Sequence, residues 1–357
     1  MSTLDWGWND YFEALWKDAE RQSAVPARVI AQSRGIWRVA GDFGECPAEP
    51  VGKLRLAAEE GADWPAVGDW VAVEFRDKGS AARIQDVLPR RSRFVRKMAG
   101  KKIAEQVVAA NVDIALLVSA LDGDFNPRRV ERYLTQCWES GAKPVIVLNK
   151  ADVCQTPREK IGEMERVAMG VPVCVVSAKT GQGLDELEKH LARGQTIVLL
   201  GSSGVGKSTI VNRLFGRAIQ EVREVRESDS RGRHTTTARE IFALPCGTLL
   251  MDTPGLRELQ LWDADDGISQ AFADIEALAE SCRFGNCRHE GEPGCAVQSA
   301  IDAGALDFGR LENWRKLQRE LAFLKRKVDP EANHSEKRRI KQLMRGVNKM
   351  YRDREKS

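Results

Sequence analysis

The chain has 357 residues, of which 42% are hydrophobic and 30% are charged, and its formal net charge is +3. That length predicts two or three domains, and the composition is typical of a globular protein rather than a disordered or fibrous one. No apolar run approaches the roughly 18–20 residues of a membrane span. The acidic, aromatic start MSTLDWGWND is unlike a secretory signal or a transit peptide. A cytoplasmic protein without a membrane partner is therefore expected.

Residues 1–24 form a short amphipathic extension, and short alternating runs separated by glycines follow over residues 25–98. Several short strands with frequent turn signals predict a small β-barrel or sandwich, and a barrel of the oligonucleotide-binding (OB) type is one candidate of this size. Tryptophans on alternating strands are more often core residues than platforms for nucleic-acid bases. The side chains here that are suited to stacking or backbone contact are Trp37, Trp70, Phe94, Arg90, Arg91, Arg93 and Arg96.

Between residues 104 and 262, apolar runs of strand length alternate with helical stretches such as NPRRVERYLTQCWES. The apolar runs are DIALLVSAL, PVIVLNK, PVCVVSA, TIVLLG, REIFAL and TLLMDTPG. This alternation predicts a mostly parallel sheet with helices on both faces. Residues 263–357 are predicted to be mainly helical, with one interruption by a Cys/His cluster.

Positive charge is concentrated at the C-terminal end. Residues 310–357 contain 16 Lys and Arg against 7 Asp and Glu, a balance of +9, which leaves −6 for residues 1–309. A basic tail on an acidic body predicts a polyanionic partner, although a solvated helical surface would have a similar composition.

The segment GSSGVGKS, which follows the apolar run TIVLL and precedes a helical stretch, fits the phosphate-loop pattern G-x-x-x-x-G-K-[ST]. Its glycines let backbone N–H groups approach phosphate oxygens at the start of a helix, whose dipole favours anions. Lys207 would reach the β- and γ-phosphates, and the Ser208 hydroxyl would ligate Mg²⁺.

Three further motifs follow strand ends. In DTPG (residues 252–255), an acid can hold Mg²⁺ through water and a glycine can offer its N–H to the γ-phosphate. In NKAD (residues 149–152), the carboxylate can accept hydrogen bonds from guanine N1–H and its 2-amino group, which adenine cannot supply. SAK (residues 177–179) can touch the base oxygen. Each motif alone could be an ordinary turn or polar loop, but ligands of such sheets bind at the carboxyl ends of strands, where all four meet.

The motif set resembles that of GTPases, with GRHTTT (residues 232–237) as switch I, but NKAD and SAK precede the phosphate loop. Because the ends of a compact domain often lie close together, a circular permutation can change the order and keep the site. Permuted order, an upstream barrel and a downstream Cys/His cluster together resemble the ribosome small-subunit-dependent GTPase A family over nearly the whole chain.

The resemblance implies an N-terminal OB-type β-barrel (25–98), a circularly permuted P-loop GTPase domain (104–262) of α/β class, and a mostly helical zinc-binding domain with a basic tail (263–357). It also implies action in late maturation of the small ribosomal subunit, with GTP hydrolysis to GDP stimulated by that subunit and its rRNA as a partner. A monomer is expected. The predicted nucleotide-binding residues are Asn149, Lys150, Asp152, Ser177, Ala178, Lys179, Gly201, Ser202, Ser203, Gly204, Val205, Gly206, Lys207, Ser208, Thr209 and Gly255. The predicted Mg²⁺ ligands are Ser208, Thr235, Thr236 and Asp252.

The predicted metal cluster is Cys282-x₄-Cys287-x-His289-x₅-Cys295, set among glycines. Three thiolates and one imidazole make a closed tetrahedral set for one structural Zn²⁺, with no position left for substrate. The alternative is that free cysteines happen to cluster in a loop without binding a metal. The other five cysteines are scattered, which suits a reducing compartment.

Many GTPases position the attacking water with a glutamine directly after the D-x-x-G glycine, but Leu256 stands there in this chain. His234, beside the switch I threonines, is the predicted replacement, and an ordinary loop histidine is the alternative. His234 and Lys207 are thus the predicted catalytic residues. Two other functions compete with a GTPase: an assembly scaffold in which bound GTP only orders the switches, and an ATP-using kinase, which NKAD and SAK disfavour.

Overall fold

The structure is a computed structural model whose contacts divide the chain into two compact units, Met1–Gln260 with Asp266–Ala273, and Leu261–Asp265 with Asp274–Ser357. No helix in the described part of the chain is long and apolar enough to span a membrane. The described residues are 1–17, 23–33, 35–52, 54, 64–75, 81–97, 105–215, 239–252 and 264–328.

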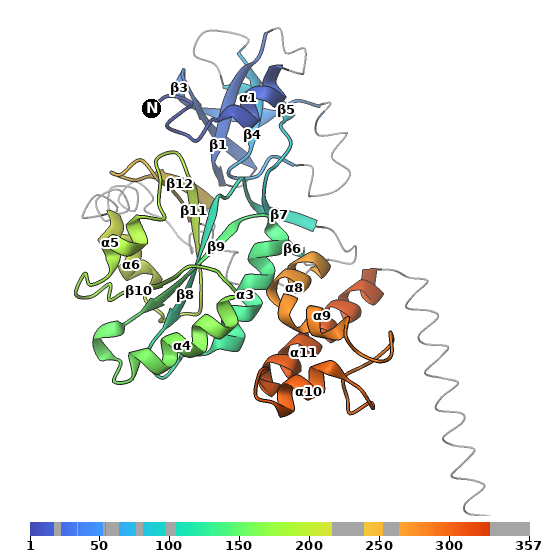
Figure 1. The fold of residues 1–357 in the computed structure, drawn as a ribbon. Helices are drawn as coiled ribbons and strands as arrows, with labels where there is room; N and C mark the ends of the chain where they lie inside the picture. Colours follow the sequence, from blue (N-terminus) through green and yellow to red (C-terminus); the bar gives the residue numbers. More distant parts are fainter. Residues whose placement is uncertain are drawn as a thin grey trace, which may run out of the picture. The chain divides into compact units, whose positions relative to one another are not determined.

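The first unit begins with a closed five-stranded barrel (Figure 1, blue). Its strands are β1 (Val25–Ser33), β2 (Ile36–Gly41), β3 (Gly44–Pro50), β4 (Trp70–Glu74) and β5 (Ala82–Val87). The strand order is β1-β2-β3-β5-β4, and antiparallel pairing of β1 with β4 closes the barrel. The predicted OB-type barrel is thereby confirmed.

The tryptophans of the barrel are core residues. Trp37 is only 4% exposed, stacks on Trp64 with ring centroids 5.7 Å apart, and donates from Nε1 to the carbonyl of Pro65 at 2.7 Å. Trp70 is fully buried beneath the rings of Trp8 and Phe12, which bring α1 (Asp10–Lys17) onto the barrel. A buried ring cannot stack on a nucleic-acid base, so the core interpretation of both tryptophans is confirmed.

Phe94 is also buried, at 2% exposure, which makes its predicted suitability for base stacking wrong. It lies in β6 (Arg93–Lys97), which pairs antiparallel with β7 (Glu105–Ala110) in a separate two-stranded sheet. Among the predicted backbone-binding arginines, Arg90 instead forms an ion pair of 2.7 Å with the fully buried carboxylate of Asp69.

The rest of the first unit is an α/β domain that confirms the predicted alternation. Its strand order is β10-β9-β8-β11-β13-β12, and all neighbours are parallel except β12 and β13. The strands are β8 (Ile114–Ala120), β9 (Lys143–Asn149), β10 (Val173–Val175), β11 (Thr196–Leu200), β12 (Arg239–Ala243) and β13 (Leu249–Asp252).

Helices cover both faces of this sheet (Figure 1). On one face lie α3 (Pro127–Ser140) and α4 (Pro157–Ala168), and on the other lie α5 (Leu184–Glu188) and α6 (Lys207–Phe215). The main core cluster packs side chains of α5 and α6 against alternate residues of the strands, such as Leu116 and Val118 of β8. Burial on both faces explains why the strands are continuous apolar runs.

The sheets of the barrel and of the α/β domain join into one sheet of eleven strands, which the sequence did not predict. Strand β1 pairs antiparallel with β12 at Ala31↔Glu240 and Gln32↔Arg239. An ion pair between Arg38 of β2 and Glu240 lies beside this junction.

The second unit contains α9 (Ala273–Ala279), α10 (Ala296–Asp302) and α11 (Phe308–Val328), while most of α8 (Asp265–Ala271) belongs to the first unit. Arg310, 3% exposed, holds α11 to α9 by two bonds of 2.8 Å to the carboxylate of Asp274.

Arg28 of β1 is a buried charged group of the first unit with four hydrogen-bond partners. It is 1% exposed and donates to the carbonyls of Trp6 (2.5 Å), Gly68 (3.2 Å) and Asn111 (3.1 Å), and to Oγ1 of Thr196 (2.9 Å). Burial lowers the pKa of Arg28 to about 10, which still leaves the guanidinium protonated at neutral pH. One side chain thus joins the N-terminal segment, the barrel and the α/β domain.

Arg28→Met should lower the free energy of unfolding of this unit by about 3 kcal/mol or more, because the buried carbonyls of Trp6 and Asn111 and the hydroxyl of Thr196 lose a donor. Urea unfolding followed by tryptophan fluorescence measures the change. The control is Arg193→Ala, which removes an ion pair at the surface with Asp5 and should change the stability much less. Equal effects of the two variants would contradict the role given to Arg28.

Candidate nucleotide-binding site and metal cluster

The predicted motifs meet at the carboxyl edge of the α/β sheet. Asn149 ends β9, Ser177 follows β10, Gly201 follows β11 and Asp252 ends β13. These strands are neighbours or next neighbours in the order β10-β9-β8-β11-β13, so their ends lie on one edge. The structure therefore brings together the described members of all four motifs, as in other parallel sheets that bind ligands at this edge.

The phosphate loop has the backbone that its glycines allow. Gly204 and Gly206 have φ of +82° and +96°, a region that side chains rarely adopt. A Cβ at Gly206 would lie 2.2 Å from Nδ2 of Asn149, so a larger residue would displace that amide. Lys207 Nζ donates to the carbonyls of Gly201 (2.7 Å) and Ser202 (2.5 Å).

Asn149 holds three motifs together from a nearly buried position, at 3% exposure. Its Nδ2 donates to the carbonyl of Val205 in the phosphate loop at 2.9 Å. Its Oδ1 accepts from the backbone N–H of Ala178 in SAK at 3.0 Å. The same side chain therefore fixes the distance between the phosphate-binding loop and the predicted base-binding loop.

Asp152 is exposed in the short 3₁₀ helix Ala151–Val153, and its Oδ1 accepts from the hydroxyl of Ser177 at 2.7 Å. The backbone N–H of Thr180 donates to the same hydroxyl at 3.2 Å. Lys150 precedes Asp152 in the left-handed conformation, with φ of +66°. These contacts orient one carboxylate oxygen inward and leave the other for a ligand.

Residues that no sequence motif included also make contacts at this edge. Asp122, in the loop after β8, forms an ion pair of 2.6 Å with Lys150 Nζ, and this hydrogen bond lowers the pKa of the Asp122 carboxyl. Arg213 of α6 donates to the carbonyls of Ala178 (3.0 Å) and Lys179 (2.6 Å). An acid directly after an apolar strand was the available signal for Asp122, whereas nothing in the sequence distinguishes Arg213 from a surface residue.

Some predicted site residues lie outside the described part of the chain. They are His234, Thr235, Thr236 and Gly255. Asp252 is described at the end of β13 and is partly buried, and Ser208 and Thr209 are exposed in the first turn of α6.

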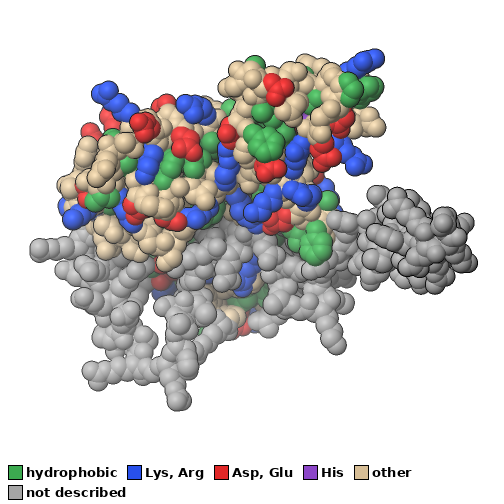
Figure 2. Space-filling model, turned by 90° about the horizontal axis from the view of Figure 1, so that it is seen from below, with side chains coloured by type: hydrophobic (Ala, Val, Ile, Leu, Met, Phe, Trp, Pro, Cys, Tyr) green, Lys and Arg blue, Asp and Glu red, His purple; other side chains and the backbone are tan. Residues whose placement is uncertain are grey.

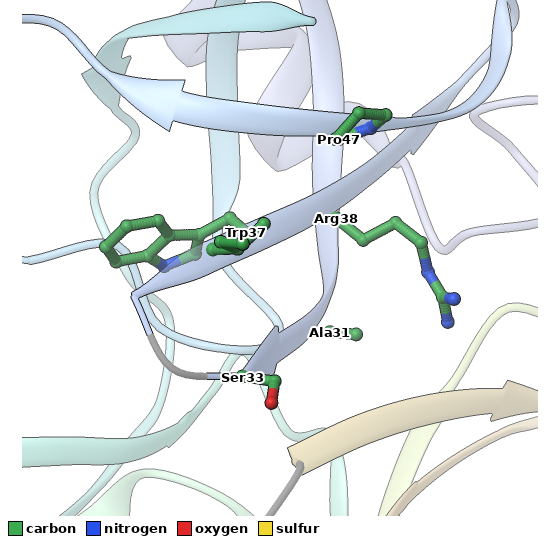
Figure 3. Close-up of a pocket in the computed structure, with 6 residues that line it drawn as sticks. Ala31, Ser33, Trp37, Arg38 and Pro47 are labelled. Carbon is green, nitrogen blue, oxygen red and sulfur yellow. The ribbon is translucent and has the colours of Figure 1, made fainter. Parts of the chain in front are cut away.

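A cavity of about 350 Å³ on the barrel is mostly apolar, unlike the polar edge of the α/β sheet (Figure 3). Its lining residues are Ala31, Ser33, Ile36, Trp37, Arg38 and Pro47. Figure 3 shows Trp37 and Arg38 pointing to opposite sides of β2, as neighbours on a strand do. Arg38 already pairs with Glu45 and Glu240, so this mostly apolar hollow does not offer the polar chemistry of the sheet edge.

The cysteines and histidine of the second unit converge as predicted. The Sγ atoms of Cys282 and Cys295 lie 4.0 Å apart, and 3.6 and 3.4 Å from Nδ1 of His289. With Cys287, all four ligand atoms fall within 4.8 Å of one another. Tetrahedral coordination with a metal–sulfur distance of about 2.3 Å requires separations of this size. The four side chains can hold one metal ion.

Comparison with known proteins identifies the chain's relatives. The model of the RsgA GTPase family matches residues 87–262. The "Small ribosomal subunit biogenesis GTPase RsgA" of Syntrophotalea carbinolica is 43% identical over 353 residues, which cover 97% of this chain and 96% of that protein. The protein of the same name from Opitutus terrae is 43% identical over 355 residues, with 97% of each chain covered.

Two solved structures share the fold. YjeQ from Thermotoga maritima has a TM-score of 0.63 and 26% identity, covering 84% of this chain and 99% of its own. YloQ, described as a circularly permuted GTPase, has a TM-score of 0.59 and 21% identity over 85% of this chain and 96% of its own. With the permuted motifs assembled at one sheet edge and relatives of this similarity over nearly its full length, the chain belongs to the RsgA GTPase family, as its motif order predicted.

Proposed function

We propose that this GTPase binds the small ribosomal subunit, acts late in its maturation, and hydrolyses GTP to GDP and phosphate faster when the subunit is bound. The names of its relatives support the subunit as partner. The observation that carries the nucleotide chemistry is the pair of bonds from Asn149, which join the phosphate loop to the base-binding loop. We propose that the protein acts as a monomer in the cytoplasm.

In this proposal, each end of the site recognises one end of GTP. Asp152 accepts hydrogen bonds from the guanine edge, and Lys207 neutralises the β- and γ-phosphates. Ser208 would ligate Mg²⁺, with Asp252 holding it through water and Thr235 or Thr236 completing the set. Bound Mg²⁺ would neutralise charge that develops on the phosphate oxygens.

Turnover separates this function from its main competitor, a scaffold in which bound GTP only orders the switches. The test measures GTP hydrolysis by the full chain with and without purified small subunits. A rate that rises with subunit concentration and saturates supports the proposal. A rate that stays constant favours the scaffold.

We propose that the contact with rRNA rests mainly on the basic C-terminal stretch, because phosphates attract Lys and Arg regardless of sequence. On the face drawn in Figure 2, basic and acidic side chains are interspersed over the described surface rather than separated. Most of residues 310–357, with their balance of +9, lie outside the described part. Removing residues 329–357 should flatten the dependence of subunit affinity on salt, and an unchanged slope would contradict this proposal.

Asp152→Asn should weaken GTP binding by about 100-fold and improve binding of xanthosine triphosphate. The asparagine oxygen can still accept from Ser177, which leaves the amide donors facing the donors of guanine. Equilibrium titration with both nucleotides measures the change in the two affinities. Asp185→Asn, an exposed residue of α5, is the matched control, and unchanged GTP affinity in Asp152→Asn would refute the assignment.

We propose that the metal of the cysteine cluster is a structural zinc ion, since three thiolates and an imidazole favour Zn²⁺ and leave no open position. Cys287→Ala should lose stoichiometric zinc and destabilise the second unit, while GTP still binds to the first. Metal analysis, thermal unfolding and GTP titration give the three readouts. Cys246→Ala, an exposed cysteine of the first unit, is the control and should keep its zinc. Absence of zinc from the native protein would refute this proposal.

His234→Ala should keep GTP affinity but lower subunit-stimulated turnover by about 100-fold, if His234 positions the attacking water. Single-turnover hydrolysis on saturating small subunits measures the chemical step. His190→Ala, which follows α5, is a control for loss of an imidazole and should hydrolyse at the native rate. Native turnover in His234→Ala would exclude the histidine from this role.

A further inference from the structure

The loop of residues 121–126 crosses the sheet edge between the two halves of the nucleotide site. It follows β8, which lies between β9, the strand of NKAD, and β11, the strand of the phosphate loop. On the NKAD side, Asp122 pairs with Lys150 and Lys160 Nζ donates to the carbonyls of Leu121 (2.9 Å) and Asp122 (3.1 Å). The loop is thus fixed from one side by two lysines.

On the other side, Arg129, in the first turn of the helix α3 that follows this loop, contacts the phosphate loop. Asn126 caps α3, and its Oδ1 accepts from the backbone N–H of Arg129 at 3.1 Å, which fixes the first turn of the helix, where Arg129 lies. Arg129 Nη1 donates to Oδ2 of Asp124 and to Oγ of Ser202, each at 2.7 Å. Because Nη1 carries two hydrogens, both bonds can form at once and define the orientation of the guanidinium.

Ser202 is the second residue of the phosphate loop and is held at two points. Its hydroxyl accepts from Arg129, and its carbonyl accepts from Lys207 Nζ at 2.5 Å. A movement of Ser202 would therefore shift one of the two carbonyls that position the ammonium of Lys207. The contact with Arg129 acts on the lysine through a single intervening residue.

We propose that Arg129 is a positioning residue for phosphate binding: through Ser202 it holds the segment of the phosphate loop that places Lys207. This inference rests on the proposed nucleotide site. It assigns to the arginine a positional effect rather than a long-range electrostatic one, because the carboxylate of Asp124 offsets its charge at 2.7 Å. The Asp124–Arg129 pair is partly exposed, with 45% and 35% side-chain exposure, so its contribution to overall stability is small.

The test is a double-mutant cycle of Arg129→Ala and Ser202→Ala in the full-length protein, with affinities for GTP, GDP and GMP. Each single variant should bind GTP and GDP about 5- to 10-fold more weakly, and the double variant should bind no more weakly than the weaker single one. GMP lacks the β-phosphate that Lys207 contacts, so its affinity should stay constant. Additive losses, or an equal loss for GMP, would overturn the inference.

Charge and folding are tested with further variants. Arg129→Lys keeps the charge, but its shorter side chain does not bring the nitrogen to the position of Nη1, so it should not restore GDP affinity, and full restoration would overturn the positional role. Arg166→Ala, an exposed arginine of α4, should bind GDP normally. If Arg129→Ala loses stability, Ser202→Ala still tests the contact, because it removes the same hydrogen bond from the other side.

Lys207→Ala separates this inference from the proposed site. It should abolish measurable GDP binding if the phosphate loop binds the nucleotide. Normal GDP binding by Lys207→Ala would refute the proposed site itself. If Arg129→Ala binds GDP normally and Lys207→Ala does not bind it, only the positioning role is refuted.

Discussion

The guanidinium of Arg28 imposes one arrangement on three parts of the chain. Moving a cation out of water costs several kcal/mol, and the cost is offset only when its donors are satisfied. Here the acceptors come from Trp6, Gly68, Asn111 and Thr196, and the carboxylates of Asp113 and Asp69 favour the charged form. The N-terminal segment, the barrel and the α/β domain must all be in place for the charge to be buried.

The same contact lies at the start of the strand that leads to the phosphate loop. Thr196, which accepts from Arg28, is the first residue of β11, and its backbone N–H donates to Asp113 at 2.8 Å. Five residues later the chain enters the loop that holds Lys207. The barrel therefore helps to fix the strand that leads into the phosphate loop, although the predicted nucleotide-binding residues all belong to the α/β domain. Circular permutation changes which strand comes first, but the ends of parallel strands still meet at one edge.

Sequence patterns predicted what is local. Apolar runs predicted β8 to β13, glycine spacing predicted the phosphate loop, and cysteine spacing predicted the metal cluster. They did not predict Asp122, Arg129 or Arg213, because these polar residues become part of the site only through the lateral order of the strands and helices. The pairing of β1 with β12 joins residues about two hundred positions apart, and no local signal encodes it. His234, Thr235, Thr236 and Gly255 stay predictions.

The junction of β1 and β12 also determines which strand edges face water. Strand β12 would otherwise be the outer strand of the α/β sheet, with a row of unpaired N–H and C=O groups open to another chain. Pairing with β1 covers part of that row, and closure of the barrel removes the remaining edges of its own sheet. The barrel therefore protects the α/β sheet from edge-to-edge association, and an α/β domain without the barrel would expose an unpaired strand edge that favours aggregation.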